Sequence, residues 1–219
     1  MALLKLKPKL EYHNKIKDFL IVSDANYQAY IYLDSWPLWQ GKSSIIHGAH
    51  NSGKTALATY FAKISQAEFI DLYNMNALEL DKLLSNAPHF IIDDFEKYFH
   101  RKSVLRNLKH HHFKDLEAIL LRILNHAADA HKSVLLLTNS DPACLKINSA
   151  DLSSRVNSYS KFKVTPPSEA SLLSFIEQKN ITENLMLSDV DMTEIISNCT
   201  DYSYRAANTA LTEFIEKNA

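Results

Sequence analysis

The sequence is poor in glycine and cysteine, lacks long apolar runs, and has no excess of charge of either sign. Its 219 residues include three glycines and two cysteines, and the formal net charge is -1. The cysteines, Cys144 and Cys199, lack metal-type spacing and argue against a disulfide framework. No apolar run approaches the length of a membrane span, and the near-zero charge gives no overall attraction to nucleic acid or anionic lipid. We therefore expect a cytoplasmic globular protein without a membrane segment.

Two of the three glycines belong to one short motif around which the chain is organised. A short strand-like run ending at His47 precedes the motif, and an alanine- and leucine-rich stretch follows it. The motif has the pattern Gly-x-x-x-x-Gly-Lys-Thr and consists of Gly48, Ala49, His50, Asn51, Ser52, Gly53, Lys54 and Thr55. Strand, loop and helix in this order are typical of a P-loop, in which backbone N–H groups and the positive end of the helix dipole face phosphates.

The P-loop pattern predicts bound ADP or ATP together with Mg²⁺. Lys54 is expected to contact the β- and γ-phosphates, and the Thr55 hydroxyl is expected to hold the metal ion. Asn51 lies where many P-loops carry a further glycine, and asparagine tolerates a left-handed backbone better than most residues. The predicted nucleotide-binding residues of this region are Gly48, Asn51, Ser52, Gly53, Lys54, Thr55 and Ala56.

A second apolar run ends in two carboxylates. Phe90, Ile91 and Ile92 directly precede Asp93 and Asp94. A continuous apolar run is typical of a strand buried on both faces of a parallel sheet, and its carboxyl end lies at the edge where such sheets bind ligands. This is a Walker B pattern, in which Asp93 would hold the Mg²⁺ shell and Asp94 would orient the attacking water.

A third apolar run ends at Thr138 and Asn139, which we expect at the same edge of the sheet. Asn139 is the candidate sensor of a γ-phosphate. Arg155 follows a short polar helix and precedes a fifth strand, and Arg205 lies early in the last predicted helix. The expected helices cover residues 24–36 with Ser23 or Asp24 as cap, 77–84, 113–131, 168–178 with Ser168 as cap, 189–198 and 203–216, and the expected strands cover 44–47, 68–72, 88–92, 133–137 and 161–164.

Two basic segments have more than one interpretation. Residues 1–18 carry five lysines, which favour a solvated tail over an extended peptide that docks on another protein. Residues 100–114 contain three consecutive histidines among lysines and arginines. Neighbouring side chains on a helix face apart, so a single metal ion is disfavoured. A solvated basic face is favoured there over a contact with DNA or a partner.

The joint order of these motifs resembles the DnaA branch of the AAA+ ATPases, above all its Hda-like regulators. The resemblance covers about residues 17–219. It implies a parallel five-stranded α/β sheet flanked by helices, with a small all-helical lid. The implied divisions are a basic arm at 1–17, a nucleotide-binding domain at 18–166 and a lid at 167–219. The segments that carry it are Asp18–Val22, Trp36-Pro37, Ile92–Asp94, Leu121–Asn125, Leu136–Thr138, Asp151–Arg155, Pro166-Pro167 and Tyr204–Ala207.

The resemblance implies a nucleotide-binding regulator of replication initiation with at most weak ATPase activity of its own. In this interpretation it docks on ATP-bound DnaA and Arg155 acts as an arginine finger on the partner's γ-phosphate, while Arg205 contacts the protein's own nucleotide. A homodimer and contact with the sliding clamp are further expectations. Clamp-binding peptides of this group usually start with Gln-Leu, whereas Leu3–Pro8 has no glutamine, so clamp contact should be weak.

The chain shows no helix-turn-helix module after the lid, so sequence-specific DNA binding is not expected. Two other functions stay open at this point. One is a helicase-loader-like ATPase that acts on single-stranded DNA through residues 100–114. The other is a small-molecule kinase, which is disfavoured because a kinase needs several basic residues in its substrate pocket.

Overall fold

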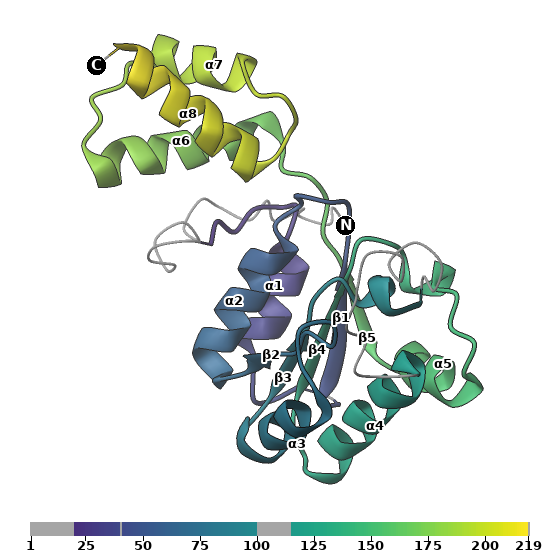
Figure 1. The fold of residues 1–219 in the computed structure, drawn as a ribbon. Coiled ribbons are helices and arrows are strands. Elements are labelled where there is room, and N and C mark those ends of the chain that lie inside the picture. Colours follow the sequence, from purple (N-terminus) through teal and green to yellow (C-terminus); the bar gives the residue numbers. More distant parts are fainter. Residues whose placement is uncertain (1–19, 40, 100–114, 219) are drawn as a thin grey trace, which may run out of the picture.

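A five-stranded parallel sheet forms the centre of the computed structural model, which describes residues 20–39, 41–99 and 115–218. The strands lie in the order β2-β3-β4-β1-β5. Their bounds are β1 Ser43–His47, β2 Glu68–Phe69, β3 Phe90–Ile92, β4 Val134–Thr138 and β5 Ser160–Lys163. This order brings the carboxyl ends of β3, β4 and β1 side by side at one edge of the sheet (Figure 1). The predicted fold class is confirmed.

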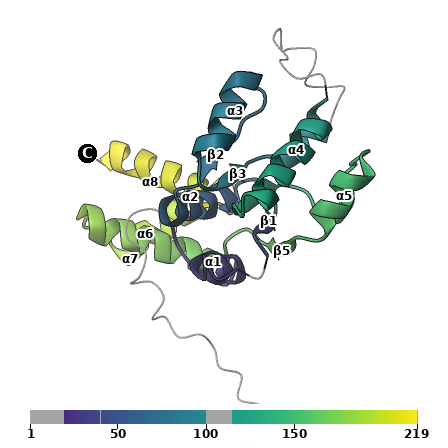
Figure 2. The ribbon, with the colours of Figure 1, turned by 90° about the horizontal axis from the view of Figure 1, so that it is seen from below.

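Two layers of helices cover the two faces of the sheet. Every residue of β4 is buried because its side chains alternate between these layers. Leu135 and Leu137 pack with α1 and α2, whereas Val134 and Leu136 pack with α3, α4 and α5. In Figure 2, α1 and α4 lie on opposite sides of the strands. The helices are α1 Tyr27–Asp34, α2 Lys54–Ser65, α3 Ala77–Asn86, α4 Leu116–Asp129 and α5 Ala150–Asn157.

Three C-terminal helices form a lid with a hydrophobic core of its own. They are α6 Glu169–Glu183, α7 Asp189–Ser197 and α8 Tyr204–Asn218. Leu172, Ile176, Ile195, Ala207 and Leu211 are buried between them. The chain reaches the lid through the segment after β5, and Figure 1 shows the lid beyond the sheet edge at which β1 ends. Among the described residues, no helix has both the length and the apolarity needed to cross a membrane.

The entry into α1 differs from the prediction. The helix begins at Tyr27, and neither Ser23 nor Asp24 caps it; Asn26 precedes its first residue. The Asn26 side chain accepts the Ser23 N–H at 2.9 Å and donates to the Ile21 carbonyl at 2.7 Å. Asn26 therefore stabilises the turn before the helix, and the helix starts later than its apolar pattern suggested.

Other helix and strand boundaries also differ from the prediction. Strand β2 has two residues where five were expected, because it lies at the sheet edge and both of its side chains are exposed. Arg155 lies in the last turn of α5, not after a helix. Ser168 caps α6 as predicted, since its hydroxyl accepts the Ser171 N–H at 3.3 Å. The basic segments 1–18 and 100–114 both lie entirely outside the described residues.

The core between the sheet and α2 predicts a large cost for truncating Phe61. This side chain is fully buried, and its ring stacks on Trp39 with centroids 4.9 Å apart. Phe61→Ala should lower the free energy of unfolding by about 3–5 kcal/mol, measured by urea denaturation, because it leaves a cavity. Leu78→Ala is the control, since Leu78 is 64% exposed on α3 and should change stability by less than about 0.5 kcal/mol. Equal effects of the two changes would contradict this core.

Candidate nucleotide pocket

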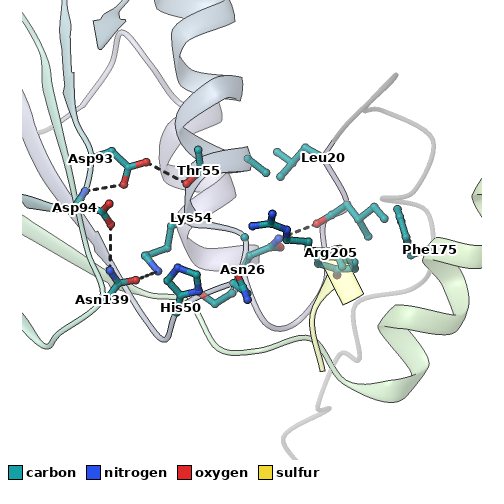
Figure 3. Close-up of a pocket in the computed structure, with 16 residues that line it drawn as sticks. Leu20, Asn26, His50, Lys54, Thr55, Asp93, Asp94, Asn139, Phe175 and Arg205 are labelled. Atoms are coloured by element: carbon teal, nitrogen blue, oxygen red, sulfur yellow. Dashed lines mark hydrogen bonds between the residues drawn. The ribbon is translucent and has the colours of Figure 1, made fainter. Parts of the chain in front are cut away.

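A cavity of about 340 Å³ lies between the carboxyl edge of the sheet and the lid. Figure 3 shows Asp93, Asp94 and Asn139 on one side of it, and Leu20, Phe175 and Arg205 on the other. The residues that line it are Leu20, Ile21, Asn26, His50, Asn51, Ser52, Gly53, Lys54, Thr55, Ala56, Asp93, Asp94, Asn139, Phe175, Tyr204 and Arg205. The fold thus brings nearly all of the predicted nucleotide-site residues to one place.

The backbone of the P-loop explains its glycines. A Cβ added to Gly48 would lie 2.0 Å from the carbonyl oxygen of Val164, so a side chain cannot fit there. Gly53 has φ 96°, a left-handed conformation that favours glycine. Asn51 also adopts a left-handed conformation, with φ 61°. The loop therefore has two residues with left-handed backbone before the helix, Asn51 and Gly53, and both residue types tolerate this conformation.

Helix α2 begins at Lys54 without a side-chain cap and without an acidic residue in its first turn. By contrast, side chains cap the N-termini of α3, α4, α5, α6 and α7. An uncapped helix start leaves backbone N–H groups and the positive end of the dipole available to an anion. The start of α2 therefore fits a phosphate group.

Lys54 carries a buried positive charge at the centre of the pocket. Its side chain donates to the carbonyls of Gly48 at 2.9 Å and Ala49 at 2.8 Å, and to Asn139 Oδ1 at 2.9 Å. These three acceptors use all three N–H groups of the ammonium. Burial lowers the pKa of Lys54, and the nearby carboxylates of Asp93, Glu96 and Asp94 counteract this shift. A phosphate that contacts Lys54 must displace at least one of these acceptors.

Thr55 and Asp93 are the residues that fit a magnesium ion. The Thr55 hydroxyl donates to Asp93 Oδ2 at 3.1 Å, so both oxygens face the same point beside the P-loop. The described residues contain no group of three or more His, Cys, Asp or Glu side chains suited to a metal. A hydroxyl and one carboxylate suit Mg²⁺ bound to phosphates, because this ion keeps several water ligands and needs no protein cage.

Asn139 contacts the second carboxylate of the Walker B pattern, Asp94, and a further acidic residue, Glu96. Its side-chain nitrogen donates to Asp94 Oδ1 at 3.1 Å and to Glu96 Oε1 at 2.6 Å. Asp94 has φ 48°, which turns the chain sharply after β3 and brings Glu96 beneath Asn139. Our sequence analysis missed Glu96, although a carboxylate three positions after Asp93 was a visible signal.

The lid supplies one wall of the pocket. Arg205 is exposed at the start of α8 and lines the cavity together with Tyr204 and Phe175. Tyr204 and Phe175 contact each other edge to face, with ring centroids 5.6 Å apart. Burial raises the pKa of Tyr204. These aromatic residues and Leu20, which also lines the cavity, were absent from our predicted site because single apolar residues have no sequence signature.

Arg155 does not line the P-loop pocket. It lies in a separate groove of about 460 Å³ along α4 and α5. The groove is lined by Leu121, Asn125, Asp151, Ser154, Arg155, Ser158 and Tyr159. Arg155 is half-buried there, and its guanidinium donates to the Leu124 carbonyl at 3.5 Å. Its positive charge also lowers the pKa of Tyr159, against a larger rise caused by burial.

Solved structures similar to this chain include the replication initiation protein DnaA and the Holliday junction branch migration motor RuvB. Domain III of DnaA from Thermotoga maritima is 15% identical, with a TM-score of 0.66, and the match covers 91% of this chain and 87% of that one. AMPPCP-bound DnaA from Aquifex aeolicus is 18% identical with a TM-score of 0.66, covering 91% and 66%. RuvB from Thermotoga maritima, in its R170A form, is 14% identical with a TM-score of 0.60, covering 86% and 60%.

No protein-family model matches the chain, and a search of curated proteins gave no significant match. The chain spans slightly less than two thirds of the length of the longer DnaA structures that it matches. At these identities the similarity concerns the fold. The protein thus has an AAA+-like fold, similar to those of DnaA domain III and RuvB.

Proposed function

We propose that the protein is a nucleotide-binding regulator of chromosomal replication initiation that promotes hydrolysis of DnaA-bound ATP. One observation carries this proposal. The P-loop, the Walker B carboxylates, Asn139 and Arg205 share one pocket, whereas Arg155 lies in a different groove. An arginine outside the protein's own pocket is placed to serve the nucleotide of a neighbouring molecule. The similarity to DnaA structures supports DnaA as this neighbouring molecule.

The protein's own nucleotide is ADP or ATP, held by the P-loop. The uncapped start of α2 and the left-handed loop direct backbone N–H groups at the phosphates, and Lys54 neutralises part of their charge. Thr55 and Asp93 hold Mg²⁺, which when bound offsets the negative charge of the phosphates. Asp94 orients water, and Arg205 adds a contact from the lid. The AMPPCP-bound DnaA structure supports this choice of ligand.

Arg155 acts in trans as an arginine finger. Docking of DnaA along α4 and α5 places the guanidinium against the γ-phosphate of DnaA-bound ATP. Negative charge develops on the phosphoryl oxygens in the transition state. In related phosphoryl transfers a fixed guanidinium stabilises this charge by roughly several kcal/mol. To reach the phosphate, Arg155 exchanges its long contact with the Leu124 carbonyl for bidentate contacts with phosphate oxygens.

Other partners follow from the same proposal. The arm at residues 1–17 makes a weak contact with the sliding clamp, which serves as a platform, and it lies outside the described residues. A homodimer through the same groove would place Arg155 of one copy at the pocket of the next. Sequence-specific DNA binding is not part of the function.

The similarity to RuvB, a Holliday junction branch migration motor, favours one alternative, an ATPase that acts on DNA. If our proposal is correct, the purified protein should bind single-stranded and duplex DNA only weakly, and its affinity should fall steeply as the salt concentration increases. Its ATP turnover should not increase when DNA is added. Fluorescence anisotropy and a phosphate-release assay measure both properties, and strong stimulation by single-stranded DNA would favour the helicase-loader-like alternative.

Lys54→Ala should lower the affinity for ADP and ATP at least about a hundredfold, measured by calorimetry, because the phosphates lose a buried cation. Arg205→Ala should weaken binding less, since Arg205 is exposed and is one of several phosphate contacts. Lys82→Ala, at an exposed lysine of α3, is the control and should bind normally. Unchanged affinity in Lys54→Ala would remove the nucleotide-binding role of the P-loop.

Arg155→Ala should keep the protein's own nucleotide affinity and lose stimulation of DnaA. The reaction contains DnaA loaded with ATP, DNA and the sliding clamp, and the readout is hydrolysis of the DnaA-bound nucleotide. Arg122→Ala is a matched control, since Arg122 lies on α4 but pairs with Asp81 of α3.

The two readouts separate the explanations for Arg155. Full stimulation without Arg155 would overturn the trans mechanism. Joint loss of nucleotide binding and stimulation would instead assign Arg155 to the protein's own site. No stimulation by the unmodified protein would overturn the proposed function itself.

A further inference from the structure

Glu96 is an acidic residue of the pocket region that the proposed mechanism does not use. It lies in the first turn of a short 3-10 helix, Phe95–Phe99, that directly follows Asp94. Its Oε1 accepts the Asn139 backbone N–H at 2.9 Å and the Asn139 side-chain N–H at 2.6 Å. Its other oxygen, Oε2, is buried and has no hydrogen-bond partner in the part of the chain that the structure describes. A buried carboxylate needs hydrogen-bond donors. Glu96 therefore strongly favours an arrangement in which N–H groups point toward it.

The partners of Asn139 determine how its amide group is oriented. The side-chain nitrogen faces two carboxylates, Asp94 at 3.1 Å and Glu96 at 2.6 Å, and the oxygen faces the Lys54 ammonium at 2.9 Å. Ionised carboxylates only accept hydrogen bonds and an ammonium only donates them. Turning the amide over would lose all three bonds and would set its oxygen against two negative groups.

This orientation has a consequence for a third phosphate. Lys54 marks where the β- and γ-phosphates bind, and phosphate oxygens only accept hydrogen bonds. Asn139 presents its oxygen to Lys54 at this place and directs a side-chain N–H group toward Asp94 (Figure 3). Its side-chain nitrogen also donates to Glu96. A γ-phosphate that contacts Asn139 must therefore reorient the amide against Glu96. A diphosphate whose β-phosphate displaces only the P-loop carbonyls from Lys54 leaves Asn139 as it is.

We propose that Glu96 is a positioning residue that holds the Asn139 amide turned away from the γ-phosphate, so that the pocket discriminates against a triphosphate. This inference rests on the nucleotide binding proposed above. Glutamine at this position would remove the discrimination, because its amide can either accept from Asn139 or donate to it. Asn139 could then turn over without losing its partner.

The test compares the affinities for ADP and for AMPPCP, a non-hydrolysable triphosphate, by calorimetry at one Mg²⁺ concentration. Glu96→Gln should raise the affinity for AMPPCP relative to ADP about tenfold. Asp71→Asn is the matched control, because Asp71 contacts the neighbouring Lys97 at 3.7 Å without lining the pocket, and it should leave the ratio unchanged. Thermal unfolding verifies that both variants fold.

Asn139→Ala separates orientation from charge. In the Asn139→Ala background, Glu96→Gln should no longer change the affinity ratio, because no amide remains to be held. An equal effect in both backgrounds would mean that the charge of Glu96 acts alone, and it would overturn the proposal. If Glu96→Gln does not fold, Asn139→Ala by itself should still raise the ratio, and an unchanged ratio would overturn the proposal.

Absence of any nucleotide binding by the unmodified protein would overturn the proposed function, and this inference with it. Binding of both nucleotides with an unchanged ratio in Glu96→Gln would overturn only the role of Glu96.

Discussion

The buried ammonium group of Lys54 is the interaction on which the arrangement of the pocket depends. An isolated buried charge is very costly, so it must be surrounded by acceptors. Here two P-loop carbonyls and the Asn139 oxygen supply them, and three carboxylates lie near. The P-loop, the end of β4 and the turn after β3 are thereby drawn to one point. Phosphates of a nucleotide would replace at least one of these internal acceptors by a charged one.

The contact between Gly48 and Val164 joins the pocket to the lid. The chain leaving β5 passes so close to the P-loop that only glycine fits at position 48. It is held there by two backbone bonds, from Val164 N–H to His47 and from Thr165 N–H to Ala25. The lid is therefore tethered beside the phosphate loop, and Arg205 reaches the pocket from there.

Much of the site could be predicted because its functional residues belong to short local sequence motifs. Glycine at positions 48 and 53, Lys54 and Thr55 stand together in the chain, and apolar runs before Asp93 and Asn139 indicated buried parallel strands. Element boundaries were less predictable. Asn26 moved the start of α1 through bonds to the preceding turn, and the edge position of β2 shortened that strand. Both effects depend on neighbours that local periodicity does not contain.

The sequence by itself determined the fold class and the residues at the strand ends, because apolar runs and turn residues act locally. Only the tertiary structure decided which of these residues meet. It brought Glu96 against Asn139, since the left-handed backbone at Asp94 turns the chain after β3. It also separated Arg155 from the pocket by placing it on α5, which packs with α4 on the face of the sheet opposite to α2. Which residues meet depends on how the strands are ordered in the sheet, and that order comes from packing across the whole core.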